Sequence, residues 1–198
     1  MKSHRFMATP AGKLLLVVDH GSLTAVYHEV HNPPPIPSAV GVPFAKISGP
    51  SGGVGETPTA ANLLADAGTF DRAEDQFRAY FAGKRRTFSL PVQANGTDFQ
   101  QRVWAAVLAI PYGETRSYKE LAVRLGNPLM GRAIGTAIRV NPLAIIIPGH
   151  RVVSSSGAVT GYSAGAAVKR FLLDLEAGDS VRPAAWAQAA DGSDGAPP

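Results

Sequence analysis

The segment Ser117-Tyr-Lys-Glu-Leu-Ala-Val-Arg-Leu-Gly-Asn-Pro128 carries the clearest structural signal in the chain. Ser117 and Glu120 fit a capping box, in which each side chain bonds the backbone of the other residue at the start of a helix. Gly126 is typical of a helix end, and Asn127-Pro128 is typical of the start of the next helix. Two short helices joined by a Gly-Asn turn predict a helix-turn-helix, a motif that many purely structural helix pairs share.

Helical signals continue on both sides of this segment. Thr97-Asp-Phe-Gln100 is a second capping box, and an apolar stripe follows it and ends before Pro111. Further along, the apolar run Leu143-Ala-Ile-Ile-Ile147 predicts a buried strand or extended segment. A last helix is expected around residues 168–175, with Gly178 as its end.

The amino-terminal part has a different pattern. Leu14-Leu-Leu-Val-Val18 and a second apolar stretch through Val26-Tyr27 predict a β-hairpin. Residues 31–59 are rich in proline and glycine, so we expect a long irregular loop there. Thr87-Phe-Ser-Leu90 alternates like a strand. A helix that ends at Gly83 is predicted from four residues at helical spacing: Ala73, Phe77, Tyr80 and Phe81.

These patterns divide the chain into three parts. Residues 1–94 are expected to form a first domain and residues 95–178 a second, helical one. Residues 179–198 consist mainly of Ala, Gly, Pro and Asp, a composition typical of a disordered tail.

Composition excludes several classes of chemistry. The 198 residues include no cysteine, which rules out disulfides, thiolate zinc sites and any mechanism with a protein thiol as nucleophile. The net charge of +4 is modest, and the basic excess lies in residues 95–177, which is compatible with phosphate binding. No apolar stretch is long enough for a membrane span, so we expect a cytoplasmic location, associated with the nucleoid if the cell is bacterial.

Several motifs occur in one order at compact spacing, namely Gly96-Thr-Asp-Phe-Gln100, Ile110-Pro-Tyr-Gly113, Ile147-Pro-Gly-His-Arg-Val152 and Thr160-Gly-Tyr-Ser163. On these motifs the chain resembles the alkylguanine-DNA alkyltransferase family, which repairs guanine alkylated at its 6-oxygen. The resemblance covers residues 7–178. It implies an α+β fold, with an amino-terminal ribonuclease H-like α/β domain followed by a helical winged helix-turn-helix-like DNA-binding domain.

The acceptor motif of that family is Pro-Cys-His-Arg, and this chain has Pro148-Gly-His-Arg151 in its place. The resemblance implies that His150 and Glu176 are the remnant of the relay that activates the thiol, and that Asn141 braces the loop around the site. Glycine at position 149 offers no side chain, and no other cysteine exists to replace it. Transfer of an alkyl group to cysteine is therefore excluded.

The resemblance also implies how DNA is held. Tyr118 would displace a phosphate and Arg132 would fill the gap left by an extruded nucleotide, with the second helix of the motif in the minor groove. The other DNA-contacting residues on this reading are Ala133, Thr136, Arg139 and Arg151. The alkylated base would meet Val152 through its backbone and two further residues, Tyr162 and Ser163.

We predict no cofactor and no metal. The expected partner is double-stranded DNA that contains alkylated guanine, with nucleotide-excision repair proteins as recipients of the bound lesion and a monomer as the binding species. Individually, each residue also has a structural interpretation: Arg132 could be solvated, His150 could bond backbone, and Tyr118 could pack its own helix.

Four hypotheses remain open from the sequence. The leading one is an alkyltransferase-like protein that extrudes and holds alkylated guanine without transfer. The alternative is an inactive Cys-to-Gly mutant or decayed copy of a working transferase. A third is hydrolytic dealkylation by a water between His150 and the lesion. The last is a plain DNA-binding module without preference for the lesion.

Overall fold

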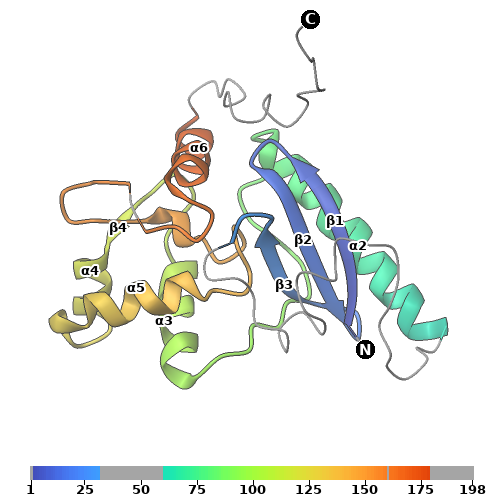
Figure 1. The fold of residues 1–198 in the computed structure, drawn as a ribbon, viewed down its shortest axis with the longest axis horizontal. Coiled ribbons are helices and arrows are strands. Elements are labelled where there is room, and N and C mark those ends of the chain that lie inside the picture. The colour runs from blue at the N-terminus through green and yellow to red at the C-terminus, as the bar shows by residue number, and fades with distance from the viewer. Residues whose placement is uncertain (1, 32–59, 160, 179–198) are drawn as a thin grey trace, which may run out of the picture.

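The structure is a computed structural model that describes residues 2–31, 60–159 and 161–178. The predicted loop, apart from His31, and the predicted tail at 179–198 lie outside the described residues. Figure 1 shows a small sheet with one long helix on one side of the molecule and a cluster of shorter helices on the other.

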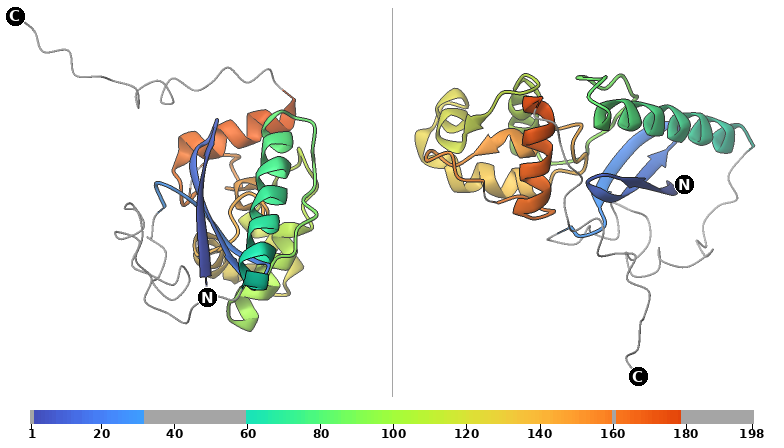
Figure 2. Two further views of the ribbon diagram at one scale, coloured as in Figure 1. Left: turned by 90° about the vertical axis from the view of Figure 1, so that its right-hand side faces the viewer. Right: turned by 90° about the horizontal axis from the view of Figure 1, so that it is seen from above.

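Three antiparallel strands form the sheet in the order β1 (Lys2–Thr9), β2 (Gly12–Asp19) and β3 (Ser22–His28). The predicted hairpin is confirmed as β2 and β3. In the central strand every side chain from Leu14 to Val18 is buried. The long helix α2 (Ala60–Phe81) lies along one face, as Figure 2 shows from above.

The second half is helical. Its elements are α3 (Asp98–Leu108), β4 (Arg116–Ser117), α4 (Tyr118–Arg124), the 3₁₀ turn η2 (Pro128–Met130), α5 (Gly131–Arg139), the 3₁₀ turn η3 (Gly149–Arg151), β5 (Val152–Val153) and α6 (Ala166–Ala177). Both predicted capping boxes are confirmed, at Thr97 and at Ser117. Asn127 caps η2, and Gly178 ends α6 with a left-handed φ of 78°. The predicted helix pair α4–α5 is present.

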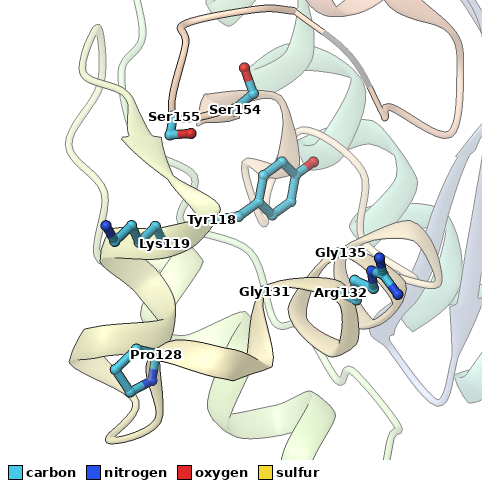
Figure 3. Close-up of a pocket in the computed structure, with 8 residues that line it drawn as sticks. All are labelled: Tyr118, Lys119, Pro128, Gly131, Arg132, Gly135, Ser154 and Ser155. Atoms are coloured by element: carbon cyan, nitrogen blue, oxygen red, sulfur yellow. The ribbon is translucent and has the colours of Figure 1, made fainter.

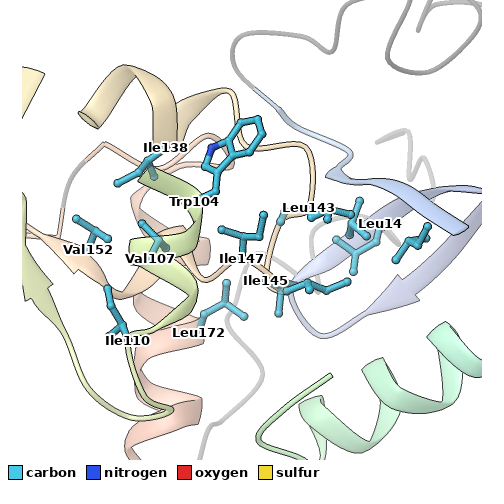
Figure 4. Close-up of a cluster of buried hydrophobic side chains, with 14 of the residues drawn as sticks. Leu14, Trp104, Val107, Ile110, Ile138, Leu143, Ile145, Ile147, Val152 and Leu172 are labelled. Atoms are coloured by element: carbon cyan, nitrogen blue, oxygen red, sulfur yellow. The ribbon is translucent and has the colours of Figure 1, made fainter. Parts of the chain in front are cut away.

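One core joins the two halves. Backbone hydrogen bonds connect β3 to the segment after α5, from Val26 N to Pro142 O (2.7 Å) and from Ala144 N to Val26 O (3.0 Å). Buried apolar side chains of both halves meet along this seam, as Figure 4 shows for Leu14 of the sheet, Leu143 and Ile145. The sheet therefore supports the loop that leads to Gly149.

The strand predicted at residues 87–90 does not form, and the strand or extended segment predicted at residues 143–147 forms only isolated bridges. At residues 87–90, the backbone N–H and C=O of Ser89 bond the Gln76 side chain at 2.7 and 3.0 Å, which occupies the groups that a neighbouring strand would use. At residues 143–147 the run is buried as expected, but the chain turns, with Ile145 at a φ of 71°. The edge strand β1, the full length of α2, the parallel pair β4–β5 and the 3₁₀ turn η3 were not predicted from the sequence.

No helix in the described ranges is long and apolar enough to cross a membrane.

Candidate functional site

An open groove of about 410 Å³ lies between α4, α5 and the segment after β5. Tyr118 and Arg132, which were predicted to contact DNA, both line it. Its other lining residues are Lys119, Pro128, Gly131, Gly135, Ser154 and Ser155. Figure 3 shows the Tyr118 ring between α5 and the two serines, with the Arg132 side chain on α5. The helix pair thus presents two cations, one phenol and several small residues on one surface.

Tyr118 is fixed at the start of α4 by the Ser117 capping box. A Cβ on Gly161, whose φ is +70°, would lie 3.1 Å from the Tyr118 hydroxyl, so glycine at 161 lets the phenol sit close to this loop. Burial raises the pKa of Tyr118, which keeps the phenol protonated as a hydrogen-bond donor at neutral pH. Tyr162, which follows Gly161 in the chain, belongs to the buried site around Gly149 and His150, so the groove is adjacent to that site.

The remaining predicted DNA contacts on α5 face outward. Ala133, Thr136 and Arg139 are all exposed. The Thr136 hydroxyl donates to the Arg132 carbonyl at 3.2 Å, which turns its polar end back toward the helix. These three residues share the outer side of α5 with Arg132, and their contact with DNA stays a prediction.

Glu176 on α6 is the centre of a buried polar network. Its Oε1 accepts from the Tyr80 hydroxyl at 2.7 Å and lies 2.9 Å from His150 Nε2. Arg151 donates to both carboxylate oxygens, at 2.8 and 2.9 Å, and the Gly113 N–H donates to Oε2 at 3.2 Å. The predicted relay pair of His150 and Glu176 is therefore in direct contact.

The protonation states in this network follow from its contacts. Burial by itself would raise the pKa of Glu176, but hydrogen bonds from His150 and Arg151 hold it well below the usual range. Burial lowers the pKa of His150, against the opposing effect of Glu176. A neutral His150 that donates Nε2–H to the carboxylate leaves Nδ1 as an acceptor. That Nδ1 is buried and has no hydrogen-bond partner among the described residues.

Arg151 requires a correction. It was predicted to contact DNA, but only 7% of it is exposed, and its guanidinium is held by Glu176 and by the Ile110 carbonyl at 2.6 Å. With its donors committed to buried acceptors, the side chain cannot reach a phosphate without breaking this network. We assign Arg151 to the buried network.

Gly149 begins the 3₁₀ turn η3 beside His150, and both residues are buried. A Cβ built on Gly149 would lie 3.9 Å from Tyr162 Cε2, and the Tyr162 ring stands edge-on to His150 with centroids 6.3 Å apart. The Tyr162 hydroxyl lies 3.2 Å from Nε2 of His28, at the end of β3. Positions 149, 150 and 162 therefore lie next to one another.

The predicted support of the loop by Asn141 has a clear geometry. Its side-chain amide donates to the Ile147 carbonyl at 2.8 Å and accepts from the Leu143 N–H at 2.9 Å. These two bonds hold the turn at 143–147 and so fix the approach to Pro148. Val152 pairs with Arg116, and its carbonyl accepts from Lys169 Nζ at 2.5 Å. Ser163 lies next to Tyr162 in a half-buried loop.

Sequence reasoning missed several residues of this site. The sequence indicated Tyr80 only as one residue of a helix face and gave His28 no place in the site, although both are buried and bonded to site residues. The groove residues Lys119, Ser154 and Ser155 carried no motif of their own. The available signal for Tyr80 and His28 was a phenol or imidazole on the apolar face of a helix or strand. Such a group is expected to be buried, and a buried polar group requires a hydrogen-bond partner.

Comparisons with known proteins give one consistent result. Residues 98–178 match the family model described as the DNA-binding domain of 6-O-methylguanine DNA methyltransferase. A methylated-DNA--protein-cysteine methyltransferase of Mycobacterium tuberculosis is 52% identical over 119 residues, which cover 60% of this chain and 72% of that protein. A protein of the same name from Methanosarcina barkeri is 54% identical over 107 residues, covering 54% of this chain and 68% of that protein.

Solved structures extend the similarity to nearly the whole chain. The crystal structure of the M. tuberculosis O6-methylguanine methyltransferase is 39% identical, with a TM-score of 0.70, and covers 96% of this chain and 99% of that chain. The M. tuberculosis protein in complex with DNA is 38% identical, with a TM-score of 0.71, and covers 91% of this chain and 96% of that chain. On these similarities the chain belongs to the methylated-DNA--protein-cysteine methyltransferase family of DNA-repair proteins, with glycine where the family resemblance expects the acceptor cysteine.

Proposed function

We propose that this protein binds duplex DNA through the α4–α5 surface, extrudes a guanine alkylated at its 6-oxygen into the region around Gly149, and holds it without taking the alkyl group. The observation that carries the proposal is the combination of an intact His150–Glu176 pair with a glycine at the neighbouring position and no cysteine in the chain. A site that keeps its buried polar frame but has no nucleophile can bind and cannot transfer.

The groove supports the DNA-binding half of the proposal. A base paired in a duplex hides its 6-oxygen, so the nucleotide must leave the stack before the site can reach it. Arg132, exposed on α5, is a planar cation suited to the vacated space, and Tyr118 lies beside it as a neutral donor for a phosphate oxygen. The small residues Gly131 and Gly135 leave room for the DNA backbone along the same helix.

The buried region supports the lesion-binding half. Tyr162 presents an aromatic edge beside Gly149, and His150 Nδ1 is an acceptor with no partner among the described residues. A purine has donors and acceptors on its edge as well as an apolar face, so such a pair of groups can bind it. We further propose that the bound complex is a monomer on DNA that passes the lesion to nucleotide-excision repair proteins.

The test is an affinity comparison between a duplex with one O6-methylguanine and its unmodified twin, at one fixed salt concentration. We expect tighter binding to the methylated duplex, and we expect Arg132→Ala to weaken that preference. The matched control is Arg124→Ala, because Arg124 is an exposed arginine on α4 that does not line the groove. Equal affinity for the two duplexes would contradict lesion recognition and leave a general DNA-binding protein.

A further inference from the structure

The packing around Gly149 leaves little room for a side chain at this position. A Cβ built on Gly149 would lie 2.9 Å from Cγ2 of Ile138, closer than real side-chain carbons pack. Ile138 is 5% exposed and stands near the end of α5. The space that any side chain at position 149 must enter is therefore already occupied by an isoleucine methyl group. Figure 4 places Ile138 beside Trp104 in the same core.

The isoleucine cannot easily give way. Cγ2 is attached directly to Cβ, so it moves only if χ1 rotates, and a β-branched residue in a helix has one strongly preferred χ1. The helix backbone is held as well, because Trp104 Nε1 donates to the Ala137 carbonyl at 2.9 Å. A shift of α5 relative to Trp104 would strain this buried hydrogen bond.

The other side of the contact is equally fixed. The Gly149 N–H donates to the Ile147 carbonyl at 2.8 Å, and that carbonyl also accepts from Asn141 at 2.8 Å. The Arg151 N–H donates to the Pro148 carbonyl at 2.9 Å, which closes the 3₁₀ turn. Gly149 has no left-handed φ, so its backbone tolerates other residues and the obstacle is the contact alone.

We propose that Ile138 is a second residue, beside Gly149, that excludes a nucleophile from this site, so that an acceptor returns only when both positions change. The inference rests on the proposed function for its location and adds a specific packing partner.

The packing half is tested by thermal unfolding of Gly149→Ala in four backgrounds: the natural Ile138, Ile138→Val, Ile138→Leu and Ile138→Ala. Valine keeps both γ carbons and is the matched control. Leucine keeps the volume but has a single γ carbon, which guards against a general loss of core packing. We expect Gly149→Ala to lower Tm by about 3 °C or more with Ile or Val at 138. With Leu or Ala we expect no loss or a small gain, because Gly→Ala restricts the unfolded chain.

The functional half is tested with Gly149→Cys in the same four backgrounds and a methylated duplex. In a competent variant the thiolate sulfur bonds the methyl carbon as the carbon–oxygen bond breaks, and the thiol proton balances the proton that guanine regains. We expect the fraction of methylated protein, read by intact mass, to rise at least tenfold from the Ile or Val background to the Leu or Ala background.

Two results would overturn the inference. One is an unchanged or higher Tm for Gly149→Ala with the natural Ile138. The other is equal methyl transfer by Gly149→Cys in all four backgrounds. Failure of the proposed function appears elsewhere, as equal affinity of the unaltered protein for methylated and unmodified duplex, while the thermal comparison still decides the packing claim.

Discussion

The Tyr80 hydroxyl on α2 donates a 2.7 Å hydrogen bond to Oε1 of Glu176 on α6, across 96 positions of sequence. This bond connects the long helix of the amino-terminal half directly to the partner of His150. The first half of the chain thus helps to orient the buried pair, in addition to packing against the second half.

We expect Tyr80→Phe to lower the free energy of unfolding by about 1.5–3 kcal/mol, because it removes a buried hydrogen bond to a charged group. Urea unfolding measures the loss. The matched control is Tyr112→Phe, since the Tyr112 hydroxyl makes only a 3.4 Å contact with the Leu175 carbonyl. Equal losses for the two variants would show that the Tyr80 bond adds nothing specific.

Arg151→Met tests the assignment of Arg151 to the buried network. We expect a loss of about 3 kcal/mol or more in unfolding free energy, because the substitution leaves Glu176 without its bidentate partner. The slope of log affinity for DNA against log salt concentration should stay unchanged in this variant. Arg132→Ala should reduce that slope if Arg132 contacts a phosphate. A smaller salt dependence of DNA binding for Arg151→Met would show that Arg151 contacts DNA and would contradict its assignment to the buried network.

Stability should fall in mild acid because of His28. Burial, together with the nearby His31 and His150, lowers the pKa of His28 to about 3 in the folded chain, while the unfolded value is about 6.5. Between these values the unfolded state binds more protons, so unfolding free energy declines as pH falls through this window. The slope approaches about 1.4 kcal/mol per pH unit for one such group.

Urea unfolding from pH 7 to pH 4 checks this expectation. His28→Gln should flatten the profile in that window, since glutamine does not titrate and keeps a polar group near Tyr162. His20→Gln is the control, because the His20 side chain is 66% exposed. A His28→Gln profile as steep as that of the unaltered protein would contradict the account. Glu176, whose pKa is depressed, adds a loss of the same sign at lower pH.

Asn141→Ala should cost about 2–3 kcal/mol of unfolding free energy and weaken the preference for methylated DNA. It leaves the buried Leu143 N–H and Ile147 carbonyl without their side-chain partner, and it frees the turn before Gly149. Asn127→Ala is the control: it removes an exposed cap bond to Leu129 N–H and should cost about 1 kcal/mol. Its lesion preference should be unchanged.

Local signals predicted the helical half well. Each capping box depends on residues three apart, and Gly126, Asn127 and Gly178 act on their own helix ends, so their effects can be read from the sequence. The left-handed Ile145 could not be predicted in this way. A β-branched residue avoids that conformation by itself, and here the bonds of Asn141 and the pairing with β3 impose it.

Long-range pairing explains the other failures. The edge strand β1 is polar at most positions and forms because Phe6 and Met7 pair with the buried Leu15 and Leu14 of β2. Arg151 is buried because its guanidinium bonds Glu176, 25 residues away, and the Ile110 carbonyl, 41 residues away. Family motifs brought Tyr118, Arg132, His150 and Glu176 forward together, but they could not show that Ile138 fills the space beside Gly149.

Recognition without transfer is tested most directly by the fate of the lesion in the bound fraction. An equal mixture of methylated and unmodified duplex is captured on the protein, released with salt and digested, and its O6-methylguanine is quantified against the input. We expect the released DNA to be enriched in O6-methylguanine, with every methyl group retained after long incubation. A released fraction at the input ratio would contradict recognition, and loss of methyl groups would contradict binding without transfer.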